Sequence, residues 1–336
     1  MNDRPSPSEP STSAELGEFD LIHRYFAPLA TAPGALGLLD DCAMFDLPDG
    51  HSGVVTTDAM VAGVHFFLDD AAYGIGWKLL AVNLSDLAAM GAVPIGYTLD
   101  LALQTGWTQQ WVREFAAGLG GCQTKYGTSL LGGDTVSTSG PMTAAITAFG
   151  AVPKGTALHR GGARVGDSVW VSGTIGDAAM AVRMRKGWTP KSAVDTTFLD
   201  QRLDLPEPRL ALGQALRGLA SAAADVSDGL AADLGHICAA SHVAAELLLG
   251  AVPLAISVQT MVRAEPDLAR EIVAGGDDYE LVFTAPAAAD SAVREVARLT
   301  GTAVTRIGRI AAGEGVRIVD PHGREIVLDR LGFAHF

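Results

Sequence analysis

Cysteine and basic residues are scarce in this chain, and each shortage excludes a class of protein. Three cysteines occur among 336 residues, with no CxxC spacing, namely Cys42, Cys122 and Cys238. A disulfide framework or a zinc site is therefore not expected, and a cytoplasmic location is the default for such a chain. Lys and Arg number 24 against 38 Asp and Glu, which gives a formal net charge of −14 and no basic stretch. Nucleic acid is excluded as an expected partner, because it requires clustered positive charge.

Long apolar runs and the common nucleotide-binding motifs are also missing. No run approaches the ~20 residues needed to span a bilayer, so no membrane partner is expected. The polar, Pro- and Ser-rich start, MNDRPSPSEPSTSAE, lacks the apolar core of a signal peptide, and residues 1–16 are predicted to form a disordered tail. The chain has no GxxxxGK[ST] loop, no HRD catalytic loop, no zinc-spaced histidines and no repeat of 20–50 residues.

Aspartates in short Gly-, Ser- or Thr-flanked segments are what the sequence does contain. Seven of them occur in the segments LLDDCA, VVTTDAM, AVNLSDLAAMG, LLGGDTV and ADVSDGL, namely Asp40, Asp41, Asp58, Asp86, Asp134, Asp225 and Asp228. Each segment adjoins an apolar run, where an uncompensated carboxylate is costly. Hard divalent cations compensate such groups, so the pattern predicts several bound Mg²⁺ ions and a polyphosphate substrate.

Simpler interpretations exist for several of these residues when each is taken alone. Asp228 is a candidate N-cap for a helix starting at Gly229, and Asp134 is a candidate turn residue. His65 in VAGVHFF has the surroundings of a core histidine, although a substrate-phosphate role stays open. The turn GTIGDA follows a strand and opens a helix; a tight turn is favoured there over a phosphate-binding site.

The length of the chain and its hydrophobic periodicity predict two domains. A hydrophobic content of 48% with 18% charged residues is typical of globular proteins. Apolar spacing predicts a helix over 73–90 that carries Asp86 and stops at Gly91, and a second helix with Thr108 as its N-cap. Helices mixed with alternating strands indicate an α+β fold, with an N-terminal domain over 17–152 and a C-terminal domain over 153–336.

Read in order, these segments resemble the thiamine-monophosphate kinases, members of the superfamily that includes aminoimidazole ribonucleotide synthetase. The resemblance rests on stretches such as TTDAMVAGVHF, NLSDLAAMGA, HRGGARVGDSVWVSGTIGDAA, DVSDGL and GGDDYEL, from about residue 18 to the C-terminus. It implies a two-domain α+β fold whose N-terminal domain pairs with its twin in a homodimer. It also implies that ATP donates its γ-phosphoryl group to thiamine monophosphate.

The resemblance further implies roles for individual residues. The implied Mg²⁺ ligands are Asp40, Thr57, Asp58, Asp86, Asp134, Asp225 and Asp228. The implied ATP contacts are Gly133, Asp134, Arg160 and Ser227, and the implied thiamine monophosphate contacts are His65, Asp277 and Phe333. No catalytic general base is expected, because a phosphate monoester with a second pKa near ~6 is already largely dianionic at neutral pH.

Two departures from the family pattern and two rival functions stay open at this point. Leu39 stands where the family has Gly before the Asp pair, and Asp277 stands where the family reads GGEDYEL. One rival is an ATP-dependent synthase or ligase of the same superfamily, which would release phosphate. The other is a non-enzymatic divalent-cation binder, which the dispersal of the acids along the chain disfavours.

Overall fold

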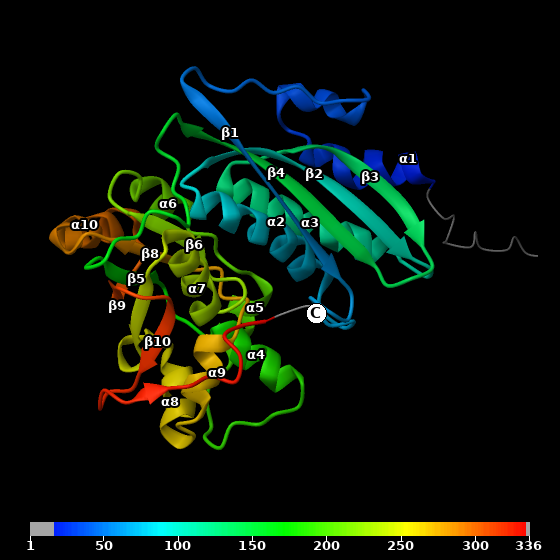
Figure 1. Cartoon of the computed structure of the whole chain (residues 1–336). Helices are drawn as coiled ribbons and strands as arrows, with labels where there is room; N and C mark the ends of the chain where they lie inside the picture. The colour runs from blue at the N-terminus through cyan, green and yellow to red at the C-terminus, as the bar shows by residue number, and fades with distance from the viewer. Residues whose placement is uncertain (1–16, 334–336) are drawn as a thin grey trace, which may run out of the picture.

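The computed structural model describes residues 17–333, and the tail expected over 1–16 lies outside the described residues. The described chain contains two β-sheets, one in each half of the sequence, with helices packed between and around them (Figure 1). The expected α+β fold is confirmed. Within 17–333, no helix is both long and apolar enough to cross a membrane.

The N-terminal half is a four-stranded sheet in the order β1-β4-β2-β3, with β2 and β3 parallel and the other pairs antiparallel. Its strands are β1 (His51–Val61), β2 (Val93–Gln104), β3 (Leu130–Thr138) and β4 (Thr143–Pro153). Two long helices cover one face of the sheet, α2 (Ala72–Ala89) and α3 (Gln109–Tyr126). Short helical segments precede β1, namely α1 (Glu18–Leu21), η1 (Ile22–Phe26), η2 (Ala27–Leu29) and η3 (Pro33–Leu38).

Helix α2 is buried on nearly every side, which makes it the central element of the molecule. Its predicted span is correct to one residue at each end, and Gly91 follows with a φ of 67° that ends the helix. Glycines let α2 and α3 approach closely: a Cβ added at Gly76 would lie 2.1 Å from the carbonyl oxygen of Phe115. Thr108 caps α3 as predicted, since its side chain accepts a hydrogen bond from the Trp111 amide at 3.1 Å.

The C-terminal half is a seven-stranded sheet in the order β11-β10-β7-β9-β5-β8-β6. Its strands are β5 (Ser168–Ser172), β6 (Ala222–Asp225), β7 (Ala244–Leu248), β8 (Leu281–Ala285), β9 (Val304–Ala311), β10 (Gly315–Val319) and β11 (Glu325–Ile326). Its helices are α4 (Asp177–Arg185), α5 (Thr197–Asp204), α6 (Leu210–Ala215), α7 (Leu230–Ser241), η4 (Leu249–Ala251), α8 (Ile256–Ala264), α9 (Leu268–Ala274), η5 (Ala287–Ala289) and α10 (Asp290–Thr300).

The two halves share a hydrophobic core around α2. One buried cluster runs from Leu80 and Leu84 in α2 to Trp170 in β5 and Phe283 in β8 of the second sheet. Polar contacts reinforce the junction, since the Trp77 indole Nε1 donates to the carbonyl oxygen of Pro206 at 3.0 Å. The sheet face of the first half and the strand ends of the second are thereby held against the same helix.

Candidate functional site

A cavity of about 1170 Å³ lies between the two halves of the chain. It is lined by residues from β1, the segment after β1, α2, α4, the loops after β6 and α9, and the C-terminal segment. Nine residues that the sequence assigned to a site line this one cavity: Asp58, His65, Asp86, Arg160, Asp225, Ser227, Asp228, Asp277 and Phe333. Segments more than 250 residues apart in the sequence are therefore brought together around one space.

Helix α2 ties the acidic residues of the two halves to one another. The Thr56 hydroxyl on β1 donates to Oδ2 of Asp86 at 2.5 Å. One residue earlier on the helix, the Ser85 hydroxyl donates to Oδ2 of Asp225 at 2.9 Å, at the end of β6. Because neighbouring residues of α2 contact β1 and β6, the carboxylates of the two sheets converge on one wall of the cavity.

The electrostatics of this wall show how closely the acids are placed. Burial, together with the nearby carboxylates of Asp86 and Asp228, raises the pKa of Asp58 to about 6. Burial also raises the pKa of Asp86, against the hydrogen bond from Thr56 and the charge of Arg160. The pKa of Asp225 lies well above its usual range because the side chain is buried and because Asp86 and other acids adjoin it. These acids together far outnumber the positive charge beside them, so the wall suits a bound cation.

The donor set of this wall fits Mg²⁺ rather than a softer metal. Its ligand atoms are carboxylate oxygens, with hydroxyl oxygens beside them and no thiolate within the described part of the cavity. Mg²⁺ favours one or two carboxylates together with phosphate and water oxygens. The buried, mutually repelling carboxylates Asp58, Asp86 and Asp225, with Asp228 at their edge, would hold such ions.

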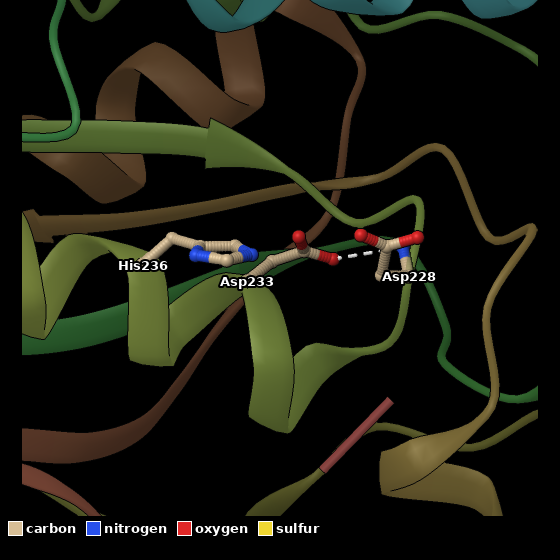
Figure 2. A group of neighbouring side chains, drawn as sticks. All are labelled: Asp228, Asp233 and His236. Carbon is tan, nitrogen blue, oxygen red and sulfur yellow. Dashed lines mark hydrogen bonds between the residues drawn. The ribbon is translucent and has the colours of Figure 1, made fainter. Parts of the chain in front are cut away.

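The loop after β6 is held by a buried carboxylate that sequence reasoning missed. Oδ2 of Asp233 accepts hydrogen bonds from the backbone N–H groups of Ser227, Asp228 and Gly229 at 3.0, 3.1 and 3.2 Å. Figure 2 shows Asp233 between Asp228 and His236, and one ligand atom from each lies within 4.8 Å of the others. Asp228 does not cap α7 with its side chain. Asp233, in the first turn of the helix, satisfies those amides instead.

The residues expected to meet thiamine monophosphate line the same cavity. The buried Lys78 of α2 forms an ion pair with Asp277 at 2.9 Å, and the Tyr279 hydroxyl donates to the same carboxylate at 3.0 Å. His65 folds back on its own turn, since its Nδ1 accepts from the Val61 amide at 3.0 Å. The amide of Phe333 donates to the carbonyl oxygen of Asp228 at 2.9 Å, which brings the C-terminal segment to the acidic loop.

Four of the predicted site residues lie away from the described lining of this cavity: Asp40, Thr57, Gly133 and Asp134. Strand alternation explains the position of Thr57, because Thr56 and Asp58 face the helices while Thr57 bonds the Ile146 carbonyl oxygen and faces outward. Asp134 is exposed on the edge strand β3. At Gly133 an added Cβ would lie 1.9 Å from the carbonyl oxygen of Leu99, so close packing is sufficient to require glycine at this position.

The turn GTIGDA is a tight turn with a buried support, which agrees with the interpretation favoured from the sequence. The amide of Gly176 donates to both oxygens of the buried Asp278 carboxylate, at 3.0 and 2.9 Å. Asp177 itself is fully buried, and its pKa is raised to about 6 mainly by burial. The Gly176 amide is therefore already used within the protein.

Lys78, Ser85 and Asp233 are functional candidates that the sequence reasoning did not identify. Lys78 and Ser85 sit inside a run of apolar residues at helical spacing, and a buried lysine in such a run is a usable signal. Asp233 lies five residues after Asp228 in the first turn of α7, where an acid satisfies free amides.

The fold and the cavity belong to a known class of two-part proteins. The family model "AIR synthase related protein, N-terminal domain" matches residues 39–152, and the model "AIR synthase related protein, C-terminal domain" matches residues 164–321. Within this class the chain belongs to the thiamine-monophosphate kinase family. It is 41% identical over 322 residues to the thiamine-monophosphate kinase of Caulobacter vibrioides, covering 95% of this chain and 90% of the relative. It is 40% identical over 324 residues to that of Escherichia coli K12, covering 95% and 98%.

Solved structures agree with this assignment. The structure of thiamine-monophosphate kinase from Stenotrophomonas maltophilia matches with 43% identity and a TM-score of 0.77, covering 84% of this chain and 89% of that chain. A structure of AaThiL complexed with AMPPCP and TMP matches with 28% identity and a TM-score of 0.75, covering 97% and 100%. The hydrogenase maturation protein HypE, in complex with ATP, shares only the fold, at 22% identity and a TM-score of 0.78.

Proposed function

We propose that this protein transfers the γ-phosphoryl group of ATP to thiamine monophosphate and so produces thiamine diphosphate. The observation that carries the proposal is the convergence of Asp58, Asp86, Asp225 and Asp228 on one wall of a cavity that His65 and Asp277 also line. Family membership supplies the identity of the two substrates. The acidic wall explains how two anionic reactants can meet in a protein with a net charge of −14.

The chain's own residues would bind and orient the reactants rather than move a proton. Bound Mg²⁺ would neutralise the phosphate oxygens and hold the donor and acceptor in line. Asp58, Asp86, Asp225 and Asp228 are the proposed ligands in the cavity. Arg160 lines the same space and would contact a phosphate through its planar guanidinium group. Phe333 would lie against the cationic thiazolium ring of the substrate.

The predicted site residues that do not line the cavity would act in a homodimer. Asp40, Thr57, Gly133 and Asp134 would contribute to metal or ATP binding through the outer side of the first sheet. That face carries exposed apolar residues, with Val55 65% and Val136 50% exposed, and strand alternation places both on the side of Thr57. A second copy covering this face would bury them. The three cysteines, all free, agree with a reducing cytoplasm.

The test is a reaction of the purified protein with thiamine monophosphate and MgATP, with products identified by mass spectrometry. Thiamine diphosphate formed in equal amount to ADP, without free phosphate, is the expected result. Release of free phosphate together with a different product would support a synthase or ligase of the superfamily instead. Cation-dependent stabilisation without ATP turnover would support a cation-binding protein and overturn the proposal.

A further inference from the structure

The loop that carries Asp277 has an unusual backbone conformation. Within the segment GGDDYE, Asp277 has a φ of 70° and Tyr279 a φ of 49°. Residues with a Cβ rarely adopt this left-handed region, and two of them within three residues require strong support from their surroundings. Asp277 and Tyr279 line the cavity, whereas Asp278 and Glu280 do not line it and are almost completely buried.

Glu280 supplies that support through a dense set of charged hydrogen bonds. Its Oε1 accepts from Arg202 at 2.7 Å and from Arg209 at 2.5 Å, while its Oε2 accepts from Arg209 at 2.7 Å. The Ser172 hydroxyl donates to Oε2 at 2.5 Å and also accepts from the Leu281 amide. Glu280 is fully buried, and Arg202 is 6% exposed. A fully buried carboxylate held by two guanidinium groups allows very little movement.

Arg202 also forms a hydrogen bond to the backbone of the loop that carries Asp277. Its guanidinium donates to the carbonyl oxygen of Asp278 at 2.9 Å, next to Asp277 in the chain. The Asp278 carboxylate is fixed in turn by the Gly176 amide. Asp277 is therefore followed directly by a residue that is held through both its backbone and its side chain.

The same loop is hydrogen-bonded to the acidic loop after β6. The Asp277 amide donates to the carbonyl oxygen of Ser227 at 2.9 Å, and the Tyr279 amide donates to that of Val226 at 2.8 Å. The Val226 amide donates back to the carbonyl oxygen of Glu280 at 2.8 Å. Backbone hydrogen bonds thus set the position of Asp277 relative to the acids of the cavity. Glu280, through its side chain, holds the segment that forms these hydrogen bonds.

We propose that Glu280, held by Arg202 and Arg209, is a positioning residue that sets Asp277 for thiamine monophosphate. The inference rests on the proposed function, since it assigns Asp277 to the acceptor substrate. Glu280 is not among the residues that line the cavity. It acts by keeping the Asp277 carboxylate aimed into the cavity, where Lys78 and Tyr279 orient it.

The variant Glu280→Gln keeps the size of the side chain and removes its charge. The KM for thiamine monophosphate is expected to rise about ten-fold or more, while the KM for ATP changes less than about three-fold, as for a contact made to one substrate only. Glu295→Gln is the matched control, because Glu295 forms an exposed ion pair with Arg298 far from this loop. Equal rises in both KM values, or a rise in the control, would show that Glu280 has a general structural role.

A double-mutant cycle tests whether Glu280 acts through Asp277. In an Asp277→Ala background, Glu280→Gln should change the KM for thiamine monophosphate by less than about two-fold, since the contact to be positioned is already gone. Additive effects of the two substitutions would overturn the inference. If Glu280→Gln does not fold, Arg209→Met and Arg209→Lys replace it. Lys, which keeps the charge, should restore most of the affinity for thiamine monophosphate that is lost with Met. Equal losses of affinity in the two variants would count against the positioning role of Glu280.

Hydrogen exchange of the metal-free protein gives a readout that needs no substrate. Amides of the segment 276–281 should exchange about ten-fold faster in Glu280→Gln than in the parent chain. Unchanged protection of these amides would overturn the positioning role of Glu280. This measurement separates the two proposals. A parent protein that does not phosphorylate thiamine monophosphate refutes the proposed function, whereas faster exchange without a selective KM change refutes the positioning role.

Discussion

Removing one acid from the crowded wall should stabilise the metal-free protein while removing its activity. In the absence of cations Asp58 is ionised at neutral pH in a site that raises its pKa from 3.8 to about 6. This difference, at 1.36 kcal/mol per pKa unit, corresponds to about 3 kcal/mol of free energy that favours unfolding. Asp58→Asn removes the charge and keeps the shape. The buried amide recovers only part of that energy, so the expected gain is about 1–3 kcal/mol.

The sign of the pH dependence follows from the raised pKa. Well below the unfolded pKa of 3.8, Asp58 is protonated in both states and has no effect on stability relative to the neutral variant. As the pH rises from 3.8 to about 6, the unfolded chain ionises before the folded protein, and stability is progressively lost. The advantage of Asp58→Asn should therefore be fully developed above about pH 7 and should shrink steadily below about pH 6.

Chemical denaturation in the presence of a chelator, at about pH 7.5 and about pH 5, measures this effect. Excess Mg²⁺ should stabilise the parent protein more than the variant, because the variant has lost a proposed ligand. Asp49→Asn, which removes a charge from an exposed loop, is the matched control and should change little. A variant less stable than the parent at about pH 7.5, or a gain that does not depend on pH, would refute the reasoning.

Three further predictions concern other parts of the molecule. Asp86→Asn should lower kcat by at least ~10²-fold with folding intact, and near-normal turnover in excess Mg²⁺ would refute a central role for this residue. Lys78→Met should raise the KM for thiamine monophosphate about ten-fold, because Asp277 loses its cationic partner; initial rates at fixed ATP test this, and an unchanged KM contradicts it. Gly118→Ala places a Cβ 1.9 Å from a backbone oxygen of α2 and should lower the free energy of unfolding by about 2–4 kcal/mol in urea denaturation. Gly132→Ala, which has open space around it, is the control. Equal effects of the two substitutions would refute the packing argument.

Local sequence patterns predicted the main helices and the grouping of the acids. Apolar spacing located α2 to within a residue, and Thr108 marked the start of α3 by its hydroxyl. The convergence of Asp58, Asp86 and Asp225 was predicted from the shared type of their segments, and the cavity contains all three.

Contacts that depend on tertiary packing were beyond reach of the same patterns. Which of Thr56 and Thr57 faces α2 depends on the orientation of β1 in the sheet, and a shift of one residue reverses the face. In the sequence, Glu280 is an acid directly before a strand, without any distinguishing neighbour. Its partners Arg202 and Arg209 lie more than 70 residues away in the chain, so the local sequence does not indicate the contact.

Since α2 contributes Asp86, accepts a hydrogen bond there from β1 and donates one from Ser85 to Asp225 at the end of β6, a single buried helix ties together the acids of both sheets. From Val327 to Phe333, by contrast, the chain has no regular secondary structure and exposes much of its surface, yet it lines the same cavity. The site is therefore built partly from a packed helix and partly from irregular, solvent-exposed chain.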